Sequence, residues 1–99
     1  MMVAVDSSVD VDLAEAFDHY EAEQTGLGVE FLYEFRRAID LIISHPGAWQ
    51  LLELPYRRCR FHRFPYGILY RVDESKQRII VVAVMHLARR SEAWRRRMN

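Results

Sequence analysis

Residues 56–90, YRRCRFHRFPYGILYRVDESKQRIIVVAVMHLARR, carry the pattern that decides the fold. Ile79–Met85 is an uninterrupted apolar run rich in β-branched residues, which is typical of a strand buried on both faces and therefore central in its sheet. The alternating residues of Tyr66–Val72 predict a second strand. The polar stretch Asp73–Lys76 is short enough for a hairpin turn, so the two strands are expected to pair antiparallel.

A third strand is expected upstream of this pair, between Arg57 and Phe64. Pro65 has no backbone N–H to donate to a ladder, so it is expected at the bend that follows. Alternation predicts one face with Arg58, Arg60, His62 and Phe64, and an opposite face with Arg57, Cys59, Phe61 and Arg63. Guanidinium groups on a rigid sheet suit phosphate or carboxylate recognition, so this strand is a candidate binding surface.

Two amphipathic helices are expected before the sheet. The first runs from about residue 10 to residue 24, and Gly26 and Gly28 follow it. The second runs from near Gly28 to about Ser44, and His45-Pro46-Gly47 ends it. Because the link between the helices is short, they are predicted to form an antiparallel pair.

The apolar sides of these helices are expected to pack on the sheet. The residues predicted to make this contact are Leu32, Phe35 and Ile39 on the second helix, and either Val82 and Val84 or Val81 and Ala83 on the sheet. A short first strand is possible at Met2–Val5, and Ala48–Pro55 is expected to be a connector. The basic segment Ser91–Asn99 is expected to be a terminal helical turn or to become ordered with a partner. The predicted fold is therefore α+β, in the order β-α-α-β-β-β.

Composition limits the class of protein. Ninety-nine residues predict a single domain over residues 1–99, and 51% apolar residues exclude a disordered chain. The only cysteine, Cys59, permits no internal disulfide and no cysteine-based zinc site. Neither a membrane-length apolar run nor a signal peptide is recognisable, so a cytoplasmic protein without membrane association is expected.

Charge is divided between the two halves of the chain. The formal net charge is zero, yet residues 1–54 hold eleven acidic residues against two arginines, and residues 55–99 hold twelve basic residues against three acidic ones. The halves therefore carry −9 and +9. This asymmetry indicates either an anionic partner for the basic half or an acidic helical layer that screens a basic sheet.

Four segments together resemble the RelE/ParE superfamily, the toxins of bacterial type II toxin–antitoxin modules. They are DLAEAFDHYE (Asp12–Glu21), LGVEFLYEFRRAIDLIISHPGAW (Leu27–Trp49), RRCRFHRFPYGILYRVD (Arg57–Asp73) and IIVVAVMHLARRSEAWRRR (Ile79–Arg97). The resemblance implies a RelE-like fold, in which a helical hairpin packs on a twisted, mainly antiparallel sheet. It also implies an antitoxin protein as partner.

The resemblance implies two kinds of target. ParE-like members poison DNA gyrase, whereas RelE-like members cleave mRNA on the ribosome without a metal ion. The expected function here is a growth-inhibiting toxin that binds an essential target such as DNA gyrase and is neutralised by its antitoxin. The alternatives are a ribosome-dependent mRNA endonuclease, and a toxin-like fold that has lost its target. RelE-type lysines have no counterpart here, since Lys76 is the only lysine and lies in a predicted turn.

Arginines and three possible proton-transfer groups are the candidate functional residues. The candidates for target or phosphate binding are Arg57, Arg58, Arg60, Arg63 and Arg89. Arg89 could instead pair with an acid of the first helix such as Glu15 or Asp18, and the others could be protective charges on an edge strand. The candidates for a catalytic role are His62, Tyr66 and His86. No cofactor or metal is expected, since the histidines lack metal-site spacing.

Overall fold

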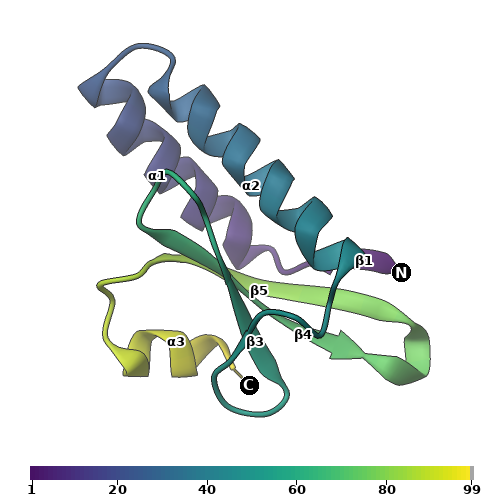
Figure 1. Cartoon of the computed structure of the whole chain (residues 1–99). Helices are drawn as coiled ribbons and strands as arrows, with labels where there is room; N and C mark the ends of the chain where they lie inside the picture. The colour runs from purple at the N-terminus through teal and green to yellow at the C-terminus, as the bar shows by residue number, and fades with distance from the viewer. Residues whose placement is uncertain (99) are drawn as a thin grey trace.

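The computed structural model describes residues 1–98 as three layers: a helical hairpin, a five-stranded sheet and a short C-terminal helix on the other face of the sheet (Figure 1). In chain order the elements are β1 (Met2–Val5), α1 (Ser8–Glu23), α2 (Leu27–Ser44), β2 (Gln50–Leu51), β3 (Tyr56–Arg60), β4 (Tyr66–Asp73), the 3-10 turn η1 (Glu74–Lys76), β5 (Arg78–His86) and α3 (Ser91–Arg97). Asn99, the last residue of the basic C-terminal segment, lies outside the described residues.

The sheet confirms the predicted order and adds one small strand. Its strands lie in the order β1-β5-β4-β3-β2, with β1 parallel to β5 and the other neighbours antiparallel. The apolar run of β5 therefore lies between two strands, as predicted. The expected connector contains the two-residue strand β2, which pairs with β3 at the edge. The α+β class and the helical hairpin on a mainly antiparallel sheet are confirmed.

The turn between α1 and α2 is organised by one carboxylate and two glycines. Glu21 accepts hydrogen bonds from the backbone N–H groups of Gly26 and Gly28, at 2.8 and 2.9 Å, and so satisfies donors at the start of α2. Gly26 has a φ of 92°, in the left-handed region that glycine adopts at little cost. A Cβ at Gly28 would lie 2.7 Å from the Phe17 ring, so the close approach of the two helices requires glycine there.

The alternation of β5 is interrupted by a bulge at Val82. Leu69 pairs with Ala83 and Tyr70 with Val81, which leaves Val82 as an extra residue. Val81 and Val84 consequently both pack against the helical hairpin, while Val82 and Ala83 belong to the core on the other face. Both alternations considered from the sequence are therefore wrong in part, because each assumed a strict period of two.

The packing of α2 differs at one predicted position. Phe35 and Ile39 pack against the core beneath the hairpin, as expected, and Phe31 and Ile42 are fully buried in it. Leu32, however, is 38% exposed, and its predicted contact with the sheet is wrong. The helix is rotated so that Phe31 points into the core, and this rotation turns the next residue, Leu32, toward solvent.

β3 ends earlier than predicted. The strand stops at Arg60, and residues 61–65 form a turn in which both Phe61 and Phe64 are buried in the hairpin-side core. The expectation that these two phenylalanines lie on opposite faces is therefore wrong. The physical cause is an anchor from α2, because the Glu34 carboxylate accepts the backbone N–H groups of His62 and Arg63 at 2.9 and 3.3 Å.

The second face of the sheet is covered by α3. Trp94 is 4% exposed and packs in a cluster with Tyr56, Leu69 and Met85. The basic C-terminal segment thus forms a helix that Trp94 anchors to the sheet, as the first of the two expected alternatives had it. Within residues 1–98, no helix is both long and apolar enough to cross a membrane.

Candidate binding groove and cleft

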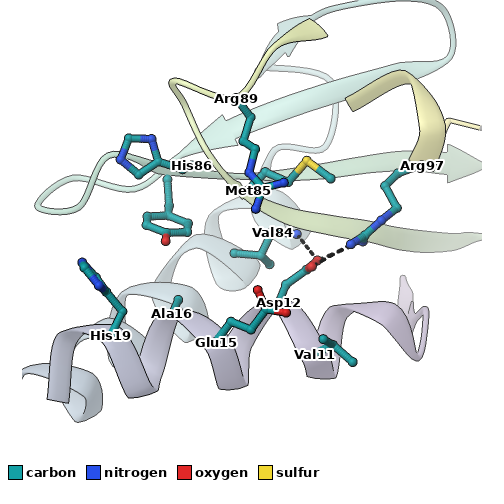
Figure 2. Close-up of a pocket in the computed structure, with 11 residues that line it drawn as sticks. Val11, Asp12, Glu15, Ala16, His19, Val84, Met85, His86, Arg89 and Arg97 are labelled. Carbon is teal, nitrogen blue, oxygen red and sulfur yellow. Dashed lines mark hydrogen bonds and ion pairs between the residues drawn. The ribbon is translucent and has the colours of Figure 1, made fainter. Parts of the chain in front are cut away.

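A cleft of about 370 Å³ opens between α1 and the end of β5 (Figure 2). Figure 2 shows its wall of α1 residues facing residues from β5, with Arg89 and Arg97 entering from the segments that follow. The lining residues are Val11, Asp12, Glu15, Ala16, His19, Tyr66, Val84, Met85, His86, Arg89 and Arg97. The cleft therefore combines acidic groups on one helix with basic groups from the C-terminal third of the chain.

Asp12 closes one end of the cleft by holding three donors. Its carboxylate accepts the two terminal nitrogens of Arg97, at 2.7 and 2.9 Å, and the backbone N–H of Val84 at 3.0 Å (Figure 2). β1 pairs with β5 only as far as Val81, so beyond that point the edge of β5 needs another acceptor. The hydrogen bond to Asp12 raises the pKa of Arg97. Asp12 therefore joins α1, β5 and α3.

Tyr66, His86 and Arg89 converge at the other end of the cleft. The Tyr66 and His86 rings meet edge to face, with their centroids 5.2 Å apart. Burial raises the pKa of Tyr66, and the nearby Arg89 guanidinium acts in the opposite direction. The backbone N–H of Ala88 donates to Nδ1 of His86 at 3.0 Å, an arrangement that leaves Nε2 to carry the imidazole proton. The site thus offers two proton donors beside a guanidinium.

A second cavity, of about 250 Å³, lies between α3 and the edge of the sheet. It is called the basic groove here, and its residues are Leu52, Glu53, Arg58, Arg89, Ser91, Trp94, Arg95 and Met98. The Arg58 guanidinium lies over the Trp94 ring, 5.4 Å from its centroid, and donates to the Gln50 amide oxygen at 2.9 Å. Burial, with the neighbouring Arg60, lowers the pKa of Arg58.

Arg89 connects the two cavities, since it lines both. Among residues 1–98, neither Arg89 nor Arg58 forms an ion pair, so the expected alternative of an Arg89 pair with Glu15 or Asp18 is not present. Arg95, in contrast, is paired with Glu53 at 2.7 Å. The groove therefore holds two guanidinium groups without a compensating carboxylate.

The remaining predicted residues are dispersed. Arg57 donates to the Trp49 carbonyl at 2.9 Å, and Arg63 pairs with Glu30 at 2.7 Å, so both serve local structure. Arg60 is exposed beside Arg58, just outside the groove lining. His62 is exposed on the turn after β3 and lines neither cavity. The arginine-rich segment is thus divided rather than forming a single patch.

Several cleft and groove residues were not predicted from the sequence. Asp12, Glu15 and His19 on α1, and Arg97 with Trp94 on α3, lie within the segments that resemble the superfamily, but none of them was a candidate site residue. The opposite charges of the two halves were the available signal, because they bring an acidic helix and a basic C-terminus together. Across residues 1–98, no group of three or more His, Cys, Asp or Glu side chains is placed to hold a metal ion.

Residues 3–91 match the family model described as "ParE toxin of type II toxin-antitoxin system, parDE". The chain belongs to the ParE toxin family. This confirms the resemblance to RelE/ParE superfamily toxins and makes the protein a toxin of the type II class. A solved chain of the chromosomal ParDE TA system from P. aeruginosa is similar in structure, with a TM-score of 0.74 and 18% identity. The match covers 87% of this chain and 95% of that one, and at this identity it shows a shared fold. No curated protein sequence matches the chain.

Proposed function

We propose that this ParE family member inhibits growth by binding DNA gyrase through the basic groove, and that an antitoxin neutralises it by covering that groove. The observation that carries the proposal is the pair of uncompensated guanidinium groups, Arg58 and Arg89, beside the buried ring of Trp94. Arginine is among the residue types that contribute most binding energy at protein interfaces, and the buried Trp94 ring holds the Arg58 guanidinium in place. Gyrase is cytoplasmic, so the proposed location is the cytoplasm.

Antitoxin binding follows from the same charges. An acidic, partly disordered segment can fold onto a basic face and gain both Coulomb attraction and apolar contact with Leu52 and Met98, which line the groove and are partly exposed. Such association is expected to weaken as salt screens the charges of Arg58 and Arg89. Isothermal titration with the product of the neighbouring gene at low and high salt measures this effect. Salt-independent affinity, or no binding, contradicts the proposed surface.

The alternative function is a metal-independent endoribonuclease, and the convergence of Tyr66, His86 and Arg89 favours it. Cleavage by the 2′-hydroxyl of RNA needs a base, an acid and a cation on the phosphate. Arg89 can serve as the cation, and His86 can donate from Nε2. The base is less well provided, because burial keeps the Tyr66 phenol protonated and Nδ1 of His86 already accepts the Ala88 N–H. Binding of gyrase is therefore placed first.

Arg89→Ala tests both functions, with Arg63→Ala as a matched control outside the groove. Growth inhibition on expression without antitoxin is expected to fall in Arg89→Ala and to persist in the control, and circular dichroism checks the fold of each. Inhibition of DNA supercoiling by the purified wild type, without cuts in ribosome-bound mRNA, supports gyrase. If the wild type cuts mRNA at codon positions and Arg89→Ala does not, the endoribonuclease becomes the favoured function. A wild type without a growth defect or activity in either assay supports a fold that has lost its target.

A further inference from the structure

The outer side of α2 carries a second seam, separate from the side that packs on the sheet. Its residues recur at alternating intervals of four and three: Val29, Tyr33, Arg36, Asp40 and Ile43. All five are exposed, with Val29 at 45%, Tyr33 at 72% and Ile43 at 38%. Figure 1 shows α2 in the hairpin layer on the outside of the sheet. This spacing is that of a coiled-coil seam, which presents one straight stripe to a partner helix.

The polar residues of this seam are complementary to each other. Arg36 and Asp40 lie one turn apart at its centre, and neither forms an ion pair with any of residues 1–98. The neighbouring Arg37, by contrast, is already within 3.8 Å of Glu34. Arg36 and Asp40 are therefore available for a partner.

An antiparallel copy of α2 gives a partner to four of the five seam positions, and Val29 alone extends past the paired region. With a two-fold axis on the outer side of α2 at the level of residue 38, Arg36 of each helix faces Asp40 of the other, and Tyr33 of each faces Ile43 of the other. A two-fold axis requires such reciprocal contacts, because each patch must be complementary to itself. A zero formal net charge also removes general repulsion between two copies.

We propose that the chain forms a two-fold homodimer through the outer side of α2, with reciprocal Arg36–Asp40 pairs between the protomers. The seam extends over roughly 20 Å of helix at about 1.5 Å per residue. A single helix pair of this length buries less than the roughly 800 Å² per partner of a standard interface, so the dimer is expected to dissociate on dilution. Both cavities lie on other elements and stay open, so one dimer presents two basic grooves.

A charge-reversal cycle tests the proposal. The chain is synthesised in a cell-free system from linear DNA, and its mass is followed by sedimentation equilibrium up to about 1 mM, the weak end of specific association. The wild type is expected to approach twice the monomer mass. Arg36→Asp and Asp40→Arg are each expected to weaken association at least about tenfold, because each reversal places like charges at both reciprocal contacts. The double variant is expected to recover the association. The control Arg90→Asp, on the exposed loop before α3, is expected to leave the association unchanged.

Three results overturn the proposal. A wild type that stays monomeric throughout excludes the dimer. A dimer that is insensitive to both single reversals, or not restored in the double variant, excludes this pairing. A monomeric wild type whose antitoxin affinity falls in Arg36→Asp assigns the seam to the antitoxin instead. Circular dichroism of each variant separates loss of association from loss of folding.

Discussion

Replacement of Asp12 by alanine removes the group that ties three elements together. The carboxylate accepts two nitrogens of Arg97 and the backbone N–H of Val84. Alanine at this position leaves the charge of Arg97 without its partner, although only 26% of the Arg97 side chain is exposed to solvent. It also leaves the Val84 N–H, at the edge of β5, without an acceptor. Asp12→Ala should therefore loosen α3 and destabilise the whole fold.

The cost can be bounded from the exposure of the pair. Asp12 is 11% exposed, so the pair lies between an exposed one, worth up to about 1 kcal/mol, and a buried one whose disruption costs about 3–5 kcal/mol. We take about 2 kcal/mol for the pair and about 1 kcal/mol for the Val84 hydrogen bond. Asp12→Ala should thus lose about 3 kcal/mol, which corresponds to a fall in Tm of about 12–24 °C. Asp12→Asn keeps an acceptor for Val84 and should lose about 2 kcal/mol.

Urea denaturation measures these losses, with Trp94 fluorescence in a Trp49→Phe background to report on α3 specifically. Asp18→Ala, an exposed acid on α1 without an ion pair among residues 1–98, is the matched control and should change stability by less than about 0.5 kcal/mol. A double-mutant cycle with Arg97→Ala should give a coupling of about 1–2 kcal/mol. An equal loss in Asp12→Ala and Asp18→Ala, or zero coupling, refutes the reasoning.

Two further predictions concern the cores. Ile42→Ala should cost about 2–5 kcal/mol because the side chain is fully buried, whereas Leu32→Ala should cost less than about 1 kcal/mol, and equal losses in thermal melts contradict the assigned helix rotation. Burial raises the pKa of Cys59 from 9.0 to about 11 and that of Tyr70 from 10.0 to about 12, so the folded state keeps these protons longer than the unfolded state. The stability that these two protonated groups contribute is complete below about pH 9 and is lost as pH rises toward 11–12. The free energy of unfolding of Cys59→Ala should therefore fall less than that of wild type between about pH 8 and about pH 11. Urea titrations at both pH values measure this, and an equal fall in the two proteins contradicts it.

Most of the fold could be predicted from local patterns. The Ile79–Met85 run indicated a central strand. The start of α2 was predicted to within one residue, because apolar residues at helical spacing and a Pro-Gly pair after the helix define a helix strongly. The candidate site was predictable only in part. Arg58 and Arg89 line the basic groove, while Arg57 and Arg63 bind local acceptors. Residue type indicates what a guanidinium can bind, but its actual partner depends on chain segments that are distant in sequence.

By itself, the sequence determined the order of elements, the central position of β5, and the acidic and basic halves, because each follows from residue types close together in the chain. Tertiary structure alone decided three things. The bulge at Val82 reversed the faces of β5, because pairing with β4 accommodates one extra residue that no local pattern marks. Burial of Trp94 gave the basic C-terminus a fixed place. The pairing of Asp12 with Arg97, 85 positions away, arises because the sheet brings α1 and α3 to the same end of β5, where an unpaired strand edge and a partly buried cation need the same carboxylate.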